Sequence, residues 1–277
     1  MDLKASLKGR LKEQELAMVS SSFDIVGDIA ILEIPKELEK KETMIAETLL
    51  KLNKNIKTVC KKAGDRYGKY RLRKYKKILG DGFGTIHKES GCQFKLDIRK
   101  AYFSVRESTE RLRIASQIKP KERVLILFSG IGPFGIIIAK NHPECEVDMA
   151  EINPKACEYA EENIRINKVG DRVNNYCGDI QKTHKSLGKY DKIIMPLPEK
   201  AYKFLDIAIQ HCERKGIIYL YAIEGRNWSE DRFPSTGKHK SEIEKTLKSK
   251  KLKIIQKRQV LPYAPGVWKV CFEVRKI

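Results

Sequence analysis

The stretch VLILFSGIGPFG, residues 124–135, decides the fold because it joins an apolar strand to a glycine turn and to the start of a helix. Val124–Leu127 has the unbroken apolar pattern of a strand that is buried on both faces. Gly130, Gly132 and Gly135 then form a G-x-G-x-x-G pattern, in which glycine permits a sharp turn and a close approach to a ligand. Alone, this pattern is a weak sign of a nucleotide site, since tight strand-to-helix turns share it.

Three further apolar segments follow, and each ends in residues suited to a cofactor. The first ends at Glu151, about 20 residues after the first glycine, where such folds place an acid for ribose hydroxyl groups. The second ends at Gly178 and Asp179, and the third ends at a P-L-P loop, residues 196–198. We therefore predict an α/β fold with a doubly wound sheet and with ligand groups at the carboxyl ends of its strands.

Two cofactors fit this arrangement. A dinucleotide enzyme uses the glycines for pyrophosphate at a helix N-terminus, whereas an S-adenosylmethionine enzyme places them beside the methionine and ribose parts. Pro133 inside the turn is uncommon in dinucleotide fingerprints, and the G-D step before a P-L-P loop favours S-adenosylmethionine, with Asp179 near the adenine. A nicotinamide oxidoreductase remains the alternative at this point.

Length and composition limit the class of protein. With 277 residues, of which 41% are hydrophobic, the chain is long enough for a globular core and two domains. No apolar run reaches the roughly 18 to 20 residues of a membrane span, and the N-terminus lacks the apolar core of a signal peptide. We therefore expect a cytoplasmic protein without a membrane partner.

Seven cysteines are spread along the chain without a C-x-x-C pair, and the five histidines are equally scattered. Zinc ligation needs clustered Cys and His, and disulfide frameworks are typical of small secreted domains. We therefore expect neither a metal site nor a disulfide framework, and we interpret the cysteines as small buried apolar residues.

The charge indicates a polyanionic partner. The formal net charge is +20, and residues 51–80 hold 12 Lys and Arg against the single acid Asp65. Within them, KYRLRKYKK (residues 69–77) interleaves two tyrosines with six basic residues, a composition suited to phosphates and to stacked bases. A solvated basic face is the alternative. The residues expected to contact RNA are Lys69, Tyr70, Arg73, Lys74, Lys76 and Lys77.

The N-terminal part has its own organisation. FDIVGDIAILEIP (residues 23–35) predicts a hairpin or a bent strand around Gly27 and Asp28, and a helix is expected over residues 36–53. Ser108 is expected to cap a helix in the segment that follows. We place an α+β RNA-binding domain at 1–118 and the cofactor domain at 119–277.

Ten motifs in order resemble one family: FDIVGDIAIL, YRLR, TIHKESG, DIRKAYFSVRESTER, LFSGIGPFG, EINP, NKV, GD, IMPLP and PYAP. The chain is similar to the archaeal and eukaryal type of tRNA guanine-37 N1-methyltransferase, a class I S-adenosylmethionine enzyme. The resemblance covers nearly the whole chain. It implies a monomeric, metal-free enzyme that binds the anticodon arm of tRNA and releases S-adenosylhomocysteine.

The resemblance also implies roles for particular residues. Glu110 would be the base that removes the guanine N1 proton, Arg71 would stabilise charge on O6, and Pro196 and Pro198 would shape the loop beside the target base. The residues that would hold the cofactor are Tyr102, Phe103, Arg106, Phe128, Ser129, Gly130, Gly132, Pro133, Phe134, Glu151, Ile152, Asn153, Asp179, Ile180 and Pro196.

The sequence departs from the family pattern at four points. Pro196 stands where the family usually has an asparagine. This proline resembles the archaeal subgroup that also methylates C7 of 4-demethylwyosine, so we expect that second activity here. Val105 and Gly266 replace a proline and an arginine. A further N-terminal domain of the family is not in this sequence, so we expect weaker recognition of the global tRNA shape.

Two alternatives remain beside nicotinamide chemistry. The sister enzyme that transfers an aminocarboxypropyl group from the same cofactor shares the fold and the glycine turn. An inert RNA-binding module would keep the basic run but would need no ordered cofactor groups.

Overall fold

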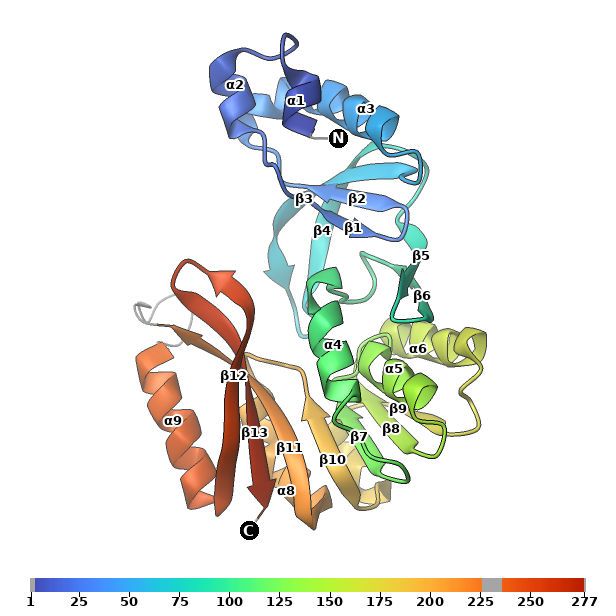
Figure 1. The fold of residues 1–277 in the computed structure, drawn as a ribbon, viewed down its shortest axis with the longest axis vertical. Coiled ribbons are helices and arrows are strands. Elements are labelled where there is room, and N and C mark those ends of the chain that lie inside the picture. The colour runs from blue at the N-terminus through green and yellow to red at the C-terminus, as the bar shows by residue number, and fades with distance from the viewer. Residues whose placement is uncertain (1–2, 226–235, 277) are drawn as a thin grey trace. The chain divides into compact units, whose positions relative to one another are not determined.

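The computed structural model describes residues 3–225 and 236–276, and the side chains of residues 236–242 lie outside the described part. The chain forms two compact units (Figure 1), of which the first comprises Met1–Glu89 with Gln93–Val105 and the second Ser90–Cys92 with Arg106–Ile277. The helix at Ser108–Ala115 packs on the helix at Pro133–Asn141 and so belongs to the second unit, whereas the domain boundary expected from the sequence lies after residue 118.

The first unit contains a four-stranded sheet of order β1-β2-β3-β4 and a separate β5-β6 hairpin. Its elements are α1 (Leu3–Leu7), α2 (Glu13–Met18), β1 (Asp24–Val26), β2 (Ile29–Leu32), the 3-10 turn η1 (Lys36–Lys41), α3 (Glu42–Leu52), β3 (Thr58–Tyr67), β4 (Leu72–Leu79), β5 (Gly84–Glu89) and β6 (Cys92–Asp97). The helix expected over residues 36–53 is therefore a 3-10 turn followed by α3.

The predicted hairpin around Gly27 is confirmed, since β1 and β2 pair antiparallel with Gly27 and Asp28 between them. Gly27 has a φ of +57°, and a Cβ atom there would lie 2.0 Å from the Thr85 hydroxyl oxygen. Only glycine fits both the turn and this approach of the β5 strand.

The second unit is a seven-stranded sheet of order β12-β13-β11-β10-β7-β8-β9 with helices on both faces (Figure 1). Its elements are η2 (Val105–Glu107), α4 (Ser108–Ala115), β7 (Arg123–Leu127), α5 (Pro133–Asn141), β8 (Glu146–Glu151), α6 (Pro154–Asn167), β9 (Val173–Cys177), α7 (Ile180–Thr183), η3 (His184–Ser186), β10 (Tyr190–Met195), η4 (Ala201–Phe204), α8 (Leu205–His211), β11 (Cys212–Gly225), α9 (Thr236–Ser249), β12 (Leu252–Ala264) and β13 (Val267–Lys276).

The strand order fixes where a ligand can bind. Strands β7, β8, β9, β10 and β11 are parallel, and the order reverses between β7 and β10, since the chain runs outward from β7 to β9 before it returns to β10. Such a switch point leaves a crevice at the carboxyl ends of the strands. The four predicted strands and the doubly wound order are confirmed.

Strand β7 is buried on both faces, as its unbroken apolar run predicts. Leu125 and Leu127 of β7 lie in one buried cluster with Ala208 of α8 and Leu247 of α9. The amphipathic helix α9 covers this face of the sheet and leads into β12. Within the described residues, no helix has both the length and the apolar character needed to cross a membrane.

The expected cap at Ser108 is wrong by one residue. Glu107 takes the N-cap position of α4 but makes no side-chain cap, because its carboxylate instead forms an ion pair with Lys269 Nζ at 2.8 Å. Both side chains are buried. This ion pair connects the start of α4 to β13.

Candidate cofactor and catalytic site

The glycine turn between β7 and α5 has a backbone that few other residues could adopt. Phe128, Gly130 and Gly132 have φ of +61°, +59° and +86°, and Gly132 is the N-cap of α5 with Pro133 as the first helical residue. A Cβ at Gly132 would lie 3.0 Å from Met149 Cε, and one at Gly135 would lie 2.5 Å from Met149 Sδ. The turn and the packing of α5 on β8 therefore both require glycine.

Glu151, at the end of β8, is hydrogen-bonded to this turn. Its Oε2 accepts from Gly130 N at 2.8 Å and its Oε1 accepts from Asn153 N at 2.8 Å. Burial raises the pKa of this carboxyl group, and the backbone donors act in the opposite direction. The predicted ribose acid is thus held in one orientation beside the turn.

The next strand end lies against the same acid. Gly178, with a φ of +145°, donates its N–H to the Glu151 carbonyl oxygen at 2.8 Å. Asp179 then caps α7, where its Oδ1 accepts from Gln181 N at 3.0 Å, and Ile180 is buried behind it. The residues predicted around ribose and adenine therefore lie on adjacent strand ends.

A disulfide joins Cys157 of α6 to Cys177 of β9, with a Cα–Cα distance of 5.8 Å. This pair is an exception to the role of small buried apolar residues, which we expect for nearly all of the cysteines. The two residues are 20 positions apart in the chain, and they meet only because α6 packs back on β9. The other five cysteines are buried and free, as expected.

The proline loop follows β10, and residues after the loop contact two other segments. Phe128 and Phe204 pack edge to face with ring centroids 4.9 Å apart, which connects the glycine turn to the segment after the loop. Pro198 is buried and Pro196 is partly exposed. Tyr263, in the PYAP motif, donates to Glu199 Oε1 at 2.9 Å, so two motifs that are distant in sequence meet here.

S-adenosylmethionine fits the residues at this switch point. Its ribose and adenine need acceptors such as Glu151 and Asp179, and its methionine part needs an open backbone such as the glycine turn. Ser129 has a buried hydroxyl oxygen with no hydrogen-bond partner among the described residues, so a polar ligand group could pair with it. Among the residues that the structure describes, no group of three or more His, Cys, Asp and Glu is arranged to hold a metal ion.

Glu110 lies on the buried face of α4, in a polar network of the second unit. Arg113 donates Nε to Glu110 Oε2 and Nη2 to Oε1, both at 2.7 Å, and Tyr221 donates its hydroxyl to Oε1 at 2.6 Å. Arg113 Nη1 also donates to Glu273 Oε1 at 2.6 Å. The ring of Tyr221 lies 6.2 Å from that of Phe134, in the helix after the glycine turn.

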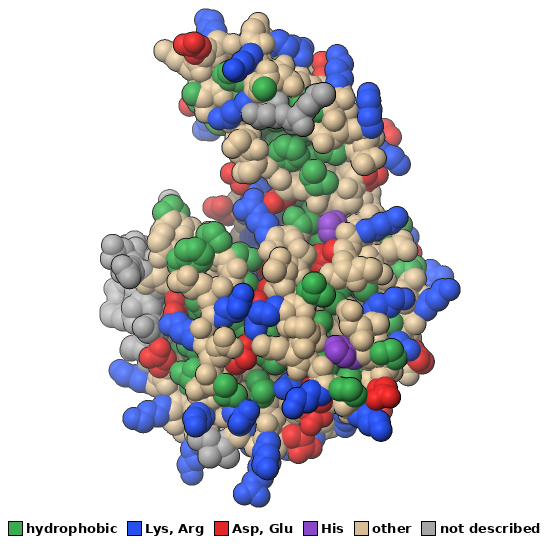
Figure 2. Space-filling model, in the orientation of Figure 1, with side chains coloured by type: hydrophobic (Ala, Val, Ile, Leu, Met, Phe, Trp, Pro, Cys, Tyr) green, Lys and Arg blue, Asp and Glu red, His purple; other side chains and the backbone are tan. Residues whose placement is uncertain are grey.

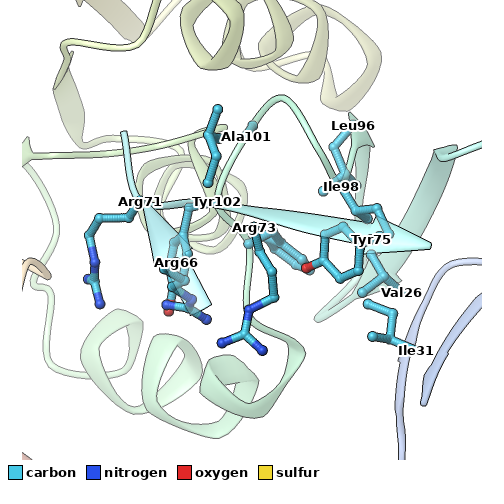
Figure 3. A pocket seen from close by; sticks show the side chains of 12 residues that line it. Val26, Ile31, Arg66, Arg71, Arg73, Tyr75, Leu96, Ile98, Ala101 and Tyr102 are labelled. Carbon is cyan, nitrogen blue, oxygen red and sulfur yellow. The ribbon is translucent and has the colours of Figure 1, made fainter. Parts of the chain in front are cut away.

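Arg71 lies in the first unit, in the turn between β3 and β4. A pocket of this unit is lined by Arg66, Arg71 and Arg73 together with aromatic and aliphatic residues of β4 and the segment after β6 (Figure 3). The guanidinium carbons of Arg66 and Arg71 lie 4.2 and 5.4 Å from the centroid of the Tyr102 ring. The cations and the ring together suit an anionic, aromatic ligand.

The predicted RNA-contacting residues divide along β4. Arg73 lines the pocket, and Lys69 and Lys74 lie over the rings of Tyr70 and Tyr67. Lys76 instead pairs with Glu42 Oε1 at 2.8 Å, and Lys77 donates to the Asp81 carbonyl oxygen at 3.3 Å. In Figure 2, Lys and Arg side chains are spread widely over the visible face, with acids among them.

The remaining predicted cofactor residues fall in both units. Tyr102 and Phe103 line the pocket of the first unit, and Phe103 lies 5.2 Å from the His87 ring. Arg106 is exposed, and Asn153 caps α6 by accepting from Lys155 N at 3.1 Å. Ile152 is partly exposed and lies between Glu151 and Asn153, whose side chains are both hydrogen-bonded.

Sequence reasoning missed several residues that shape these sites. No local pattern marks Tyr221, Glu273 or Arg66, because each acquires its role from a contact with a distant segment. Arg113 was visible at one helical turn from Glu110, a spacing that favours an ion pair.

Comparison with known proteins gives the same family. Residues 85–255 match the family model described as the TRM5/TYW2 methyltransferase domain, and residues 3–83 match that of the TYW2 N-terminal domain. A tRNA (guanine(37)-N(1))-methyltransferase of Pyrococcus abyssi is 37% identical over 270 residues, which cover 95% of this chain and 77% of the relative.

Two further relatives are named for different activities. A tRNA (guanine(37)-N(1))/4-demethylwyosine(37)-methyltransferase of Nanoarchaeum equitans is 39% identical over 209 residues, 72% of this chain and 68% of the relative. A tRNA(Phe) (4-demethylwyosine(37)-C(7)) aminocarboxypropyltransferase of Pyrococcus horikoshii is 30% identical over 274 residues, 97% and 94% of the two chains.

Solved structures agree with the fold. A complex of aTrm5 with tRNALeu has a TM-score of 0.84 and 28% identity, and the match covers 100% of this chain and 78% of that one. Methanocaldococcus jannaschii TYW2 in complex with AdoMet has a TM-score of 0.66 and 26% identity, and the match covers 92% and 100%. The fold of a methyltransferase domain preceded by an N-terminal domain is confirmed.

Proposed function

The chain belongs to the TRM5/TYW2 methyltransferase family, and we propose from this premise that it transfers a methyl group from S-adenosylmethionine to N1 of guanosine-37 in tRNA. The observation that carries the proposal is the position of Glu110. It is a buried carboxylate, held by Arg113 and Tyr221, in the same unit as the glycine turn. Both units match family models, and the solved complex of a related enzyme contains tRNA.

The residues have distinct tasks in this reaction. Guanine N1 carries a proton, so its electron pair becomes available only when a base takes that proton, and Glu110 is the base. Arg71 offsets the negative charge that then develops on O6. S-adenosylmethionine, held by Glu151, Asp179 and the glycine turn, supplies an electrophilic methyl group and leaves as S-adenosylhomocysteine.

The test is single-turnover methylation of a tRNA transcript with guanosine at position 37, followed by mass spectrometry of that nucleoside. We expect Glu110→Ala to slow N1 methylation by roughly 100-fold or more with little change in cofactor affinity. Wild-type turnover in this variant would refute the base assignment. Glu161→Ala, in the same unit, removes a carboxylate on the surface of α6 and is the matched control.

A second acceptor follows from Pro196. This residue has no side-chain donor or acceptor, so the loop after β10 offers less specific contact with guanine edges than an asparagine would. A relative with both activities in its name supports methylation of C7 of 4-demethylwyosine at position 37 as well. The reaction product from tRNA carrying that base should be isowyosine, and absence of methyl incorporation would exclude this activity.

Aminocarboxypropyl transfer is the competing reaction, since one relative with that activity aligns over most of the chain. The mass of the modified nucleoside distinguishes a methyl from an aminocarboxypropyl product. We also propose that the anticodon arm is the part of tRNA that is bound and that the enzyme acts as a monomer. Protection of tRNA from nuclease and light scattering of the complex test these two points.

A further inference from the structure

The network around Glu110 is more than a salt bridge, because its charges do not balance. Glu110 and Glu273 are two carboxylates, and both accept hydrogen bonds from the single guanidinium of Arg113. Glu110 and Glu273 are each 6% exposed. The three side chains therefore carry one excess negative charge away from water, which the arrival of one proton would neutralise.

Neither the neighbouring cysteine and tyrosine nor Lys269 supplies a free positive charge to these three side chains. Burial raises the pKa of the Cys271 thiol to about 12, and it raises the pKa of Tyr221 well above 10, so both are neutral. Lys269, whose Nζ lies 4.7 Å from the centroid of the Tyr221 ring, is already paired with Glu107. The titratable and charged groups described around Glu110 include Arg113 of α4, Tyr221 of β11, Cys271 and Glu273 of β13, and the Glu107 and Lys269 pair. Arg111, the next residue of α4, is also buried, and Tyr219 of β11 is in register with Glu273.

Hydrogen-bond geometry selects one oxygen of the carboxylate. A carboxylate has about four lone-pair directions, two on each oxygen. Oε1 accepts from Tyr221 and from Arg113 Nη2, and Oε2 accepts from Arg113 Nε. Among the contacts with described residues, three directions are used, and the fourth belongs to Oε2.

We propose that Tyr221, Arg113 and Glu273 are positioning residues that direct Oε2 of Glu110 toward the proton it removes. This inference rests on the proposed function, in which Glu110 is the base. Tyr221 and Arg113 fix the orientation of the carboxylate, and Glu273 keeps Arg113 from neutralising it completely. The N1 proton moves to Oε2, the N–H electron pair stays on the base ring, and a neutral carboxyl group results.

Two variants should shift the pH dependence in opposite directions. Tyr221→Phe removes a donor that favours the ionised carboxylate, so the acid limb of the single-turnover rate profile should move to higher pH. Glu273→Gln removes a nearby negative charge, so the same limb should move to lower pH. We expect each variant to lower the rate at neutral pH by about 3- to 10-fold, with KM for tRNA unchanged.

The matched control is Tyr190→Phe. Tyr190 of β10 is equally buried and donates its hydroxyl group to Asp148 Oδ2, so it reports the effect of losing a buried tyrosine–carboxylate hydrogen bond outside the Glu110 network. Its pH profile should coincide with that of the wild type. The dissociation constant of S-adenosylmethionine and the thermal midpoint of each variant give readouts that do not depend on methyl transfer.

The outcomes separate the two proposals. Opposite displacements of the acid limb, with cofactor affinity within about twofold of the wild type, would support the positioning roles. Unchanged pH profiles in both variants, or displacements in the same direction, would overturn them. If Glu110→Gln itself methylated guanosine-37 at the wild-type rate, the base assignment in the proposed function would fail, independently of these variants.

Discussion

The glycine turn after β7 and the basic hairpin β3–β4 are the proposed binding sites of the two substrates, but they are built differently. The turn is a backbone structure, in which the positive φ angles of Gly130 and Gly132 and the close approach of Met149 to Gly132 favour glycine at these positions. The hairpin is a surface of side chains, in which several cations already have partners within the protein. A backbone site tolerates few substitutions, whereas a charged surface distributes its affinity over many residues.

The buried Lys61 illustrates the difference. It belongs to the basic stretch by sequence, but its Nζ lies 2.8 Å from Glu39 Oε1 and 2.6 Å from Glu42 Oε2. Glu42 also holds Lys76. A count of basic residues therefore overstates the charge that this hairpin offers to RNA, because acids of η1 and α3 neutralise part of it.

The largest expected effect tests the rigidity of the cofactor side. The Cys157–Cys177 disulfide closes a loop that includes most of α6 and all of β9, and reducing it should lower the free energy of unfolding by about 3 kcal/mol. Denaturant titration with and without reductant measures this. The Cys157→Ser, Cys177→Ser double variant should be insensitive to reductant. Equal stability of the oxidised and reduced wild type would show that the sheet needs no such link.

Next in size is a change to the turn itself. Gly132→Ala forces a side chain onto a residue with φ +86°, a strain of about 1–2 kcal/mol, so S-adenosylmethionine affinity should fall roughly 5- to 30-fold. Calorimetric titration measures the affinity. Gly170→Ala is the control, since its Cβ would meet Ile164 at an ordinary 3.5 Å. If tRNA affinity fell as much as cofactor affinity, the inference that the glycine turn serves cofactor binding alone would be wrong.

A smaller effect compares two lysines of the hairpin. Lys74→Ala should weaken tRNA binding by about 3- to 5-fold and reduce the slope of affinity against salt by up to about one. Lys76→Ala should have less effect on both, because Lys76 already pairs with Glu42. Filter binding over a range of salt concentrations checks this. An equal loss for the two variants would mean that RNA displaces Glu42.

The smallest effect concerns the pH dependence of cofactor binding. Burial raises the pKa of Glu151, so this acid becomes protonated nearer to neutral pH than an ordinary glutamate. Affinity for S-adenosylmethionine should be highest at pH values well above that pKa. It should decrease as the pH falls through the pKa, since a protonated carboxyl group accepts fewer hydrogen bonds. Glu151→Gln should bind more weakly and without this pH dependence. Calorimetry at several pH values distinguishes the two behaviours.

The comparison also explains which features could be predicted from the sequence. The sequence predicts Gly130 and Glu151 at one cofactor site because strand, turn and acid follow one another at short spacing, and the hydrogen bond between them agrees with that pattern. The ion pair of Arg113 with Glu273 spans 160 residues, and no local pattern contains it. Likewise, the cap expected at Ser108 ignored the distant Lys269 that holds Glu107. Local backbone geometry can be predicted from the sequence, but the pairing of buried charges depends on the tertiary structure.

Strand β12 lies at one edge of the seven-stranded sheet, where unpaired backbone groups invite another molecule to add a strand. Ile254 and Ile255 are exposed on it, a combination that favours aggregation. Lys253, Lys257 and Arg258 share the strand, and its pairing with β13 has three register shifts that disturb a regular edge. We therefore expect these three charged side chains to oppose the pairing of β12 with the sheet of another copy.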